Sequence, residues 1–191
     1  MPNIKVMPGV IKLPLLGKIK LGIREKNDAG IEYPVPTDYF VCPDEVKRVF
    51  GQKPKELRIM FPTENSKQWA SQYLRFYSAS SGLICRGDGV TAVVRDKVTQ
   101  ENLASPFSPP LREIACNPEI CPYYLNEDCR RVMNLQFLIP DCPGFGVYQI
   151  CTSSVYSMNN IDSMVDFIRS TCQRVSMIPL LLQLVEKEVQ P

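Results

Sequence analysis

The stretch CNPEICPYYLNEDC, residues 116–129, brings three cysteines together in a short polar segment: Cys116, Cys121 and Cys129. The whole chain contains no histidine, so a zinc ion bound here would have to be held by thiolates. A fourth thiol is available at Cys85, in the segment LICRGDGV at residues 83–90. Structural zinc sites usually take two ligands from each of two short turns. The pattern predicts a structural Zn²⁺ site that is held by Cys85, Cys116, Cys121 and Cys129.

The remaining cysteines leave one alternative open for this site. The spacing of the three cysteines is looser than in a paired C-x2-C motif, which weakens the signal when it is taken alone. Cys142, in the turn-rich segment PDCPG at residues 140–144, is the rival to Cys85 as fourth ligand. Cys42, Cys151 and Cys172 lie in apolar, regular segments, where a free thiol behaves as a small hydrophobe. We expect these three thiols to be buried and unligated.

Composition places the chain among ordinary globular proteins. Apolar residues make up 45% and charged residues 22% of its 191 residues. A chain of this length buries roughly 70% of the surface that its unfolded form exposes, so it needs no metal merely to have a core. We therefore expect a single domain over residues 1–191. Within it we expect a zinc-binding insert at about residues 112–133, closed by the hairpin at residues 83–90.

The pattern of apolar and turn residues predicts an α+β fold with a mostly antiparallel sheet, two or three helices and a small zinc knuckle held by four cysteines. Seventeen prolines favour interrupted strands over a helical bundle. Gly87-Asp88-Gly89 is typical of a tight hairpin turn, and residues 99–111 are typical of a loop. The predicted strands cover residues 18–23, 37–41, 56–61, 83–85, 90–94, 132–139, 147–151 and 180–189. The predicted helices cover residues 44–50, 66–77 and about 153–173.

Two of the predicted helices have an apolar face. The last helix carries apolar residues at three- and four-residue steps, which predicts one stripe packed against the core. That stripe consists of Met158, Ile161, Val165, Ile168 and Cys172. In the helix at residues 66–77, the corresponding face consists of Trp69, Ala70, Tyr73 and Leu74.

Positive charge is concentrated near the N-terminus, although the formal net charge is only +2. The first 26 residues contain a single acidic residue, Glu25, and six basic ones: Lys5, Lys12, Lys18, Lys20, Arg24 and Lys26. Lysines in such a segment protect an exposed edge strand from pairing with other chains. The alternative is a patch that contacts phosphates or an acidic surface of a partner. The low net charge argues against a strong nucleic-acid binder.

Several classes of function are excluded or disfavoured by missing residues. Without histidine, no Ser-His-Asp triad, H-E-x-x-H motif or histidine-metal nuclease site can form. Neither the G-x-x-x-x-G-K-[ST] nor the G-x-G-x-x-G phosphate-binding motif is present. The chain shows no secretory signal and no apolar run of membrane-spanning length, which favours an intracellular, reducing compartment. We expect a protein that is not an enzyme and has no small-molecule substrate.

A series of short motifs resembles one family when the motifs are taken together and in order. They are LGI (21–23), EYP (32–34), TDYFVC (37–42), KPKEL (53–57), IMFP (59–62), GLICRGDG (82–89), CPY (121–123), NLQFLIP (134–140), PGFGVYQI (143–150) and TSS (152–154). The series resembles the recombination directionality factors of phages and mobile elements that use large serine integrases. Some close relatives are known only as metal-binding or hydrolase-like proteins. The resemblance extends over about residues 17–190, nearly the whole chain.

This resemblance implies a non-catalytic switch. A serine integrase alone joins phage and host attachment sites, and its directionality factor binds the integrase on DNA and permits excision. The partner would be a large serine integrase in the cytoplasm of a bacterial host, with DNA contacted mainly through the integrase and no membrane involved. The positions of Cys85, Cys116, Cys121 and Cys129 match what looks like a shared metal set. The resemblance also implies that family members continue beyond Pro191, and it leaves the contact surface unspecified.

Two other functions remain open from the residues themselves. One is a single-stranded-DNA-binding or replication-associated zinc protein of a phage, which would use the basic N-terminal region and the aromatic residues of the helix predicted at 66–77. The other is a zinc-dependent hydrolase. The hydrolase is the weaker candidate, because a catalytic zinc keeps an open coordination position and commonly uses imidazole or carboxylate ligands.

Overall fold

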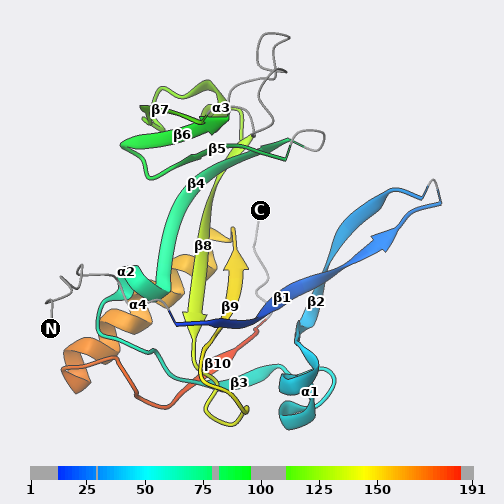
Figure 1. The fold of residues 1–191 in the computed structure, drawn as a ribbon, viewed down its shortest axis with the longest axis vertical. Coiled ribbons are helices and arrows are strands. Elements are labelled where there is room, and N and C mark those ends of the chain that lie inside the picture. The colour runs from blue at the N-terminus through cyan, green and yellow to red at the C-terminus, as the bar shows by residue number, and fades with distance from the viewer. Residues whose placement is uncertain (1–12, 29, 79–81, 96–110, 186–191) are drawn as a thin grey trace, which may run out of the picture. The chain divides into compact units, whose positions relative to one another are not determined.

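The structure, a computed structural model, describes residues 13–28, 30–78, 82–95 and 111–185. These residues form ten strands and four helices, so the chain is α+β with a mostly antiparallel sheet, as predicted (Figure 1). The helices number four, against the two or three predicted. The difference arises because α2 (Ser66–Trp69) and α3 (Pro122–Leu125) are single turns. The loop predicted at residues 99–111 lies almost wholly outside the described residues.

Two compact units make up the chain. The first holds residues 1–70, 134–151 and 162–191, and the second holds residues 71–133 and 152–161. Strand β8 (Cys129–Phe137) and helix α4 (Val155–Cys172) contribute residues to both units. Compactness alone does not define a folding unit, so the single domain with an insert at about residues 112–133 stays a prediction.

The first unit contains a sheet in the order β2-β1-β9-β8. Strand β1 (Leu15–Lys26) pairs antiparallel with β2 (Glu32–Val41) and, over Leu15–Ile19 only, parallel with β9 (Val147–Thr152). A separate antiparallel pair joins β3 (Glu56–Ile59) to β10 (Leu180–Gln183). The sequence predicted every one of these strands, although β10 ends before the predicted limit of residue 189 and residues 186–191 lie outside the described ones.

Helix α1 (Asp44–Phe50) and the apolar faces of the strands build the core of the first unit. Its most buried side chains are Ile19, Phe40, Val46, Leu57, Ile59, Trp69, Leu135, Phe137, Tyr148 and Val175. The ring of Trp69 stacks on Phe61 with centroids 3.8 Å apart, and its Nε1 donates a hydrogen bond to the Thr63 carbonyl oxygen at 2.8 Å. The indole is therefore buried with its single donor satisfied.

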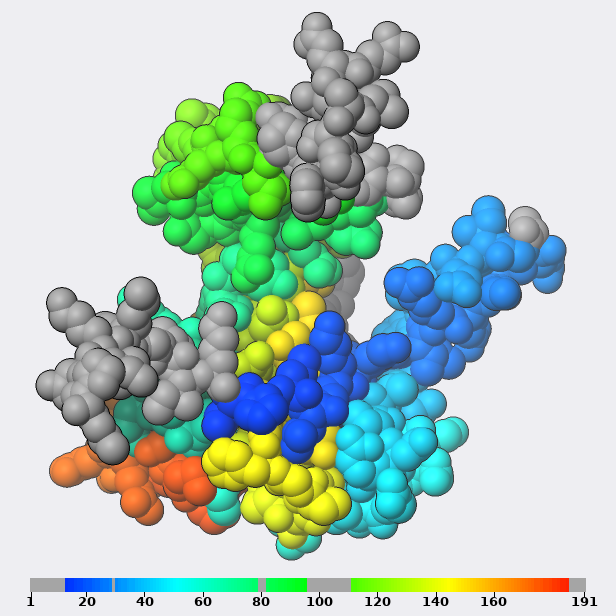
Figure 2. Space-filling model, viewed as in Figure 1, coloured from blue at the N-terminus to red at the C-terminus, as the bar shows by residue number. Residues whose placement is uncertain are grey.

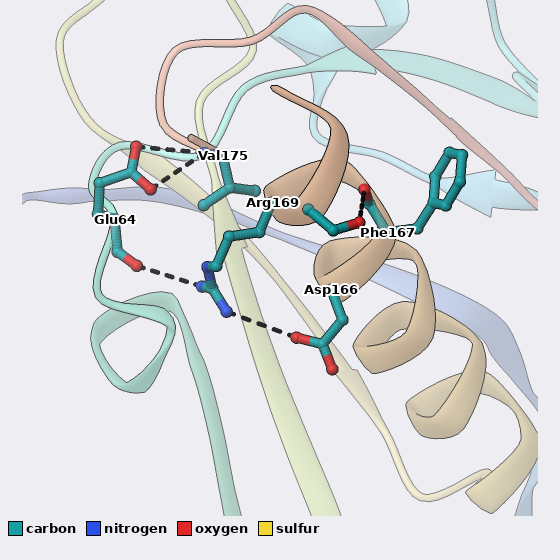
Figure 3. Close-up of polar contacts among 6 residues, drawn as sticks. Glu64, Asp166, Phe167, Arg169 and Val175 are labelled. Carbon is teal, nitrogen blue, oxygen red and sulfur yellow. Dashed lines mark hydrogen bonds and ion pairs between the residues drawn. The ribbon is translucent and has the colours of Figure 1, made fainter. Parts of the chain in front are cut away.

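Glu64 ties the segment after α4 to the rest of the first unit (Figure 3). Its carboxylate accepts the backbone N–H of Val175 and of Ser176 and the hydroxyl of Ser176. The Glu64 carbonyl oxygen accepts a hydrogen bond from Arg169, which also pairs with Asp166 one turn earlier in α4. The hydroxyl and amide donors of Ser176, with the amide of Val175, lower the pKa of Glu64 because they favour the charged carboxylate.

The second unit contains a meander of short strands in the order β8-β4-β5-β6-β7. Its further strands are β4 (Ala70–Ser78), β5 (Gly82–Gly87), β6 (Thr91–Arg95) and β7 (Leu111–Ala115). The predicted hairpin at Gly87-Asp88-Gly89 is confirmed as the β5–β6 turn. The Asp88 carboxylate accepts the N–H groups of Val90 and Thr91 at 2.8 Å each, which lowers the pKa of Asp88. Asp88 therefore closes the turn through its own side chain.

The helix predicted at residues 66–77 is wrong beyond its first turn. Helix α2 ends at Trp69, and Ala70 begins β4, which pairs antiparallel with β5. Trp69 is buried, but Leu74 is the only fully buried residue of β4, and its neighbours Tyr73 and Arg75 are half-buried. The pairing of Leu74 with Gly87 and of Arg75 with Arg86 makes this segment a strand. Tyr73, Phe76 and Tyr77 suit a pleated surface, and pairing with β5 overrides the helical spacing of the apolar residues.

The long C-terminal helix is confirmed as α4, from Val155 to Cys172. The Ser154 hydroxyl oxygen accepts the N–H of Ser157 at 3.3 Å, as an N-cap residue does. Of the predicted apolar stripe, Met158 and Val165 are buried, Ile161 and Ile168 are half-buried, and Cys172 is exposed.

Candidate functional site

The four predicted ligands all belong to the second unit, where they come from four separate elements. Cys85 lies within β5, Cys116 follows the end of β7, Cys121 is the residue before α3, and Cys129 begins β8. Local hydrogen bonds position two of them. The N–H of Cys116 donates to the Val90 carbonyl oxygen at 2.8 Å, and the N–H of Cys121 donates to the Asn117 carbonyl oxygen at 3.0 Å.

These four cysteines line one small cavity of about 30 Å³. The cavity wall also includes Leu74, Phe76, Gly87, Pro118, Tyr123 and Tyr124. Phe76 stacks on Tyr123 with ring centroids 4.7 Å apart, so an aromatic pair forms part of the wall. A Cβ atom at Gly87 would lie 2.6 Å from the Cys116 sulfur and 2.9 Å from the Ala92 side chain. Glycine at position 87 therefore leaves the room that the Cys116 sulfur occupies.

The thiols influence one another electrostatically. Burial raises the pKa of Cys129 to about 11, and the nearby Cys85, Cys121 and Cys116 add to the increase. Burial raises the pKa of Cys85 as well, with smaller contributions from Cys116 and Cys121. Two or more thiolates in this cavity would repel one another, so the protonated thiols are favoured. A bound divalent cation would favour the thiolates instead.

Four cysteine thiols are a suitable donor set for a zinc ion, although their sulfur atoms are not in a coordination geometry. Within the described ranges, no group of three or more cysteine, aspartate or glutamate side chains is arranged so that it could hold a metal ion as it stands. The four thiols nevertheless share a cavity large enough for one small ion, and soft thiolates are the ligands of structural zinc. The zinc site therefore stays a prediction.

Cys142, the rival for the fourth position, belongs to the first unit and does not line this cavity. It is buried, and its Sγ donates a weak hydrogen bond to the Glu45 carbonyl oxygen at 3.9 Å. Of the thiols expected to be buried and unligated, Cys42 is buried, and burial raises its pKa to about 11. The expected burial is wrong for Cys151 and Cys172, which are exposed. Cys151 alternates with the buried Ile150 and Thr152 along β9 and so points to the other face.

A second concave feature was not predicted from the sequence. An open groove of about 860 Å³ follows β1 and β2, lined by residues 20–24, 34–36 and Val41. Two signals in the sequence relate to it: the alternating basic residues of β1 and the Pro34-Val35-Pro36 segment of β2. The groove lies entirely within the first unit.

The cysteine cavity and the groove along β1 and β2 both lie within the part of the chain that matches a known family. The family described as Gp3-like, recombination directionality factor-like, matches residues 16–191, so the chain belongs to that family. The resemblance of the sequence motifs is thus confirmed. No curated protein matches the chain, and no solved structure matches it either. Among the helices that the structure describes, none combines the length and the apolar character that crossing a bilayer requires.

Proposed function

We propose that this chain is a recombination directionality factor that binds a large serine integrase on DNA and switches it from integration to excision. The observation that carries the proposal is the family match over residues 16–191, which spans both compact units. The factor acts without chemistry of its own, in the cytoplasm of a bacterial host. It contacts DNA mainly through the integrase.

Such a factor works through differential affinity. It needs only to bind one arrangement of the integrase on DNA more tightly than another, and the equilibrium then shifts toward the arrangement that it favours. A tenfold change in that equilibrium requires about 1.4 kcal/mol of differential binding energy. The absence of histidine and the net charge of +2 suit a protein that recognises a protein surface.

A structural zinc ion, held by Cys85, Cys116, Cys121 and Cys129, is part of the proposal. It would join β5, the segment after β7, the start of α3 and the start of β8 into one rigid piece. The ion supplies folding energy to that part of the second unit and no catalytic function. Support comes from the cavity that the four thiols share.

In vitro recombination tests the proposed switch. Purified cognate integrase is incubated with the product attachment sites, with and without this protein, and excision is measured. We expect excision only when the protein is present, and a reduced rate of integration on the original sites. An integrase with verified integration activity that shows no stimulation of excision would contradict the proposal.

The second candidate, a protein that binds single-stranded DNA, has one observation in its favour. The Arg86 guanidinium lies 4.1 Å from the centroid of the Tyr73 ring, and Arg75 pairs with Arg86 across β4 and β5. Arginine and tyrosine on a sheet are a common platform for stacked bases. The aromatic helix on which this candidate first rested does not form, so we place it second.

A further inference from the structure

In the part of the chain that the structure describes, strand β1 has an open edge over its second half. Its two neighbours in the sheet are β2 and β9, and the pairing with β9 ends at Ile19. Beyond that point, the register continues with β2 alone, from Gly22 paired with Pro36 to Lys26 paired with Glu32. Figure 1 shows this part of β1 and β2 as a two-stranded ribbon. Among the described residues, one side of the ribbon is therefore an unpaired edge of β1, and the other is the edge of β2.

The prolines of β2 determine which backbone groups of β1 face that open edge. Pro34 is paired with Arg24 and Pro36 with Gly22, and proline has no N–H to donate. These pairs must therefore be the non-hydrogen-bonded pairs of the antiparallel ladder. Because the pattern alternates, the N–H and C=O groups of Gly22, Arg24 and Lys26 point away from β2.

The same prolines close the opposite edge of the ribbon. The outward positions 34 and 36 of β2 carry no N–H, so an added strand would lose every second hydrogen bond there. The open edge of β1 has no such block. Gly22 has no side chain to shield its backbone, and a Cβ atom there would collide with the Val35 carbonyl oxygen. An extended partner therefore makes more main-chain hydrogen bonds with β1 than with β2.

Space and charge indicate what kind of segment fits. The groove of about 860 Å³ is lined by residues 20–24 of β1 and by residues 34–36 and Val41 of β2, so it lies along this part of both strands. The basic residues of β1 lie at alternate positions and thus on one face, and all of them are exposed: Lys18, Lys20, Arg24 and Lys26. On this face Glu32 pairs with Arg24 at 3.3 Å, which leaves most of the positive charge unmatched by β2. Figure 2 shows the two strands, in blue, at the surface.

We propose that the open edge of β1, residues 22–26, binds an extended segment of the integrase as an added strand, and that this segment carries acidic residues at alternate positions. The inference rests on the proposed function, because that function supplies the partner. Backbone hydrogen bonds to Gly22, Arg24 and Lys26 hold the segment, and its acidic side chains lie beside the basic face of β1. The lysines then act as recognition groups in addition to discouraging self-pairing.

Hydrogen exchange, read at single-residue resolution, tests the inference on the unaltered protein. In the free protein, the amides of Ile23 and Glu25 should exchange slowly, because they bond to β2, and those of Gly22, Arg24 and Lys26 should exchange rapidly. Adding the cognate integrase should slow the second set at least about tenfold, since each amide gains a main-chain hydrogen bond. A partner that docks on the face of the ribbon would not produce this alternation.

A matched pair of variants gives a second readout. Arg24→Pro removes the outward N–H at the position opposite Pro34, and Arg24→Ala removes the charge but keeps the N–H. We expect Arg24→Pro to bind integrase about tenfold more weakly than Arg24→Ala, with an unchanged thermal midpoint. Equal affinities, or no alternating protection, would overturn the inference while integrase binding by the unaltered protein upheld the proposed function. If the unaltered protein bound no integrase, both proposals would fail.

Discussion

At the scale of single residues, the cavity of the second unit disfavours thiolates at two of the cysteines that line it. Burial and mutual repulsion both favour protonated sulfur at Cys85 and Cys129, where they raise the pKa. A zinc ion would replace these protons and attract all four sulfur atoms at once. A site of this kind releases protons on binding metal, so its affinity falls as the pH falls.

The zinc proposal predicts the effect of removing one ligand. Native mass spectrometry should show one zinc ion per chain in the unaltered protein, and Cys121→Ser should lose it. Structural zinc contributes on the order of 10 kcal/mol in small peptides, so the segment around residues 116–129 should also become sensitive to proteases. Cys151→Ser is the matched control, because Cys151 is exposed and lies outside the cavity. Full zinc occupancy in Cys121→Ser would contradict the assignment.

Residue-level expectations succeeded where local chemistry decides the outcome. Asp88 was expected in a tight turn and closes it with its own carboxylate, because Asp-Gly needs no distant partner. The burial of Cys151 was mispredicted, because the face of a strand that meets the core depends on neighbouring elements. Tyr148 is likewise a product of tertiary packing. It is buried, and its hydroxyl has no hydrogen-bond partner among the described residues. The sequence pattern does not predict a buried hydroxyl without a partner.

At the scale of elements, hydrogen bonds of Glu64 connect the segment before α2 to the segment after α4. We call this group of contacts, made by Glu64 with Val175, Ser176 and Arg169, the Glu64 clasp. Glu64 contributes a charged acceptor to two backbone amides and one hydroxyl, and α4 adds Arg169 through the Glu64 carbonyl oxygen. Strand β3 precedes Glu64 in the chain, and β10 follows Ser176. The antiparallel pairing of β3 with β10 is a second connection between these two parts of the chain. The connection from α4 to β10 is thus fixed at both ends.

The clasp predicts how stability depends on pH. The hydrogen bonds lower the folded-state pKa of Glu64 below its ordinary value of 4.5. A group with a lowered folded pKa adds stability above its unfolded pKa and loses it as the pH falls through the folded pKa. We expect Glu64→Gln to lower the thermal midpoint at pH 7 and the difference to shrink as the pH falls below 4.5. Thermal denaturation from about pH 3 to pH 7 measures this, with Glu113→Gln on the exposed strand β7 as control.

A pH-independent difference between Glu64→Gln and the unaltered protein would contradict this account of the clasp. Ser176→Ala separates the two kinds of donor. It removes the hydroxyl and leaves both backbone amides, so it should reduce the pH dependence without abolishing it.

Element boundaries followed the sequence where the period of apolar residues was long and unbroken. Helix α4 was predicted within two residues at either end, since its apolar stripe extends over most of its length. The short segment after Ser66 has apolar residues that fit both a helix and a strand. Residues 70–78 form a strand because they pair with β5, and this pairing depends on tertiary structure that the sequence pattern does not contain.

At the scale of the whole molecule, the distribution of charge separates the two candidate functions. A factor that acts through an integrase needs little affinity for DNA, whereas a single-strand binder needs a continuous basic surface. In the second unit, Arg75 of β4 and Arg86 of β5 are directly paired across the two strands. The basic face of β1 belongs to the first unit.

Salt dependence therefore decides between the two functions. Fluorescence anisotropy with a single-stranded oligonucleotide, at about 50 and 200 mM salt, measures direct binding by this protein alone. A binder with 6–10 phosphate contacts loses about 10³–10⁵-fold in affinity over that range. We expect weak binding at both concentrations, because the net charge is only +2. Tight, steeply salt-dependent binding that Arg86→Ala abolishes, with Arg130→Ala as the control, would favour the single-strand binder. In that case Arg86 and the ring of Tyr73 would contact the DNA.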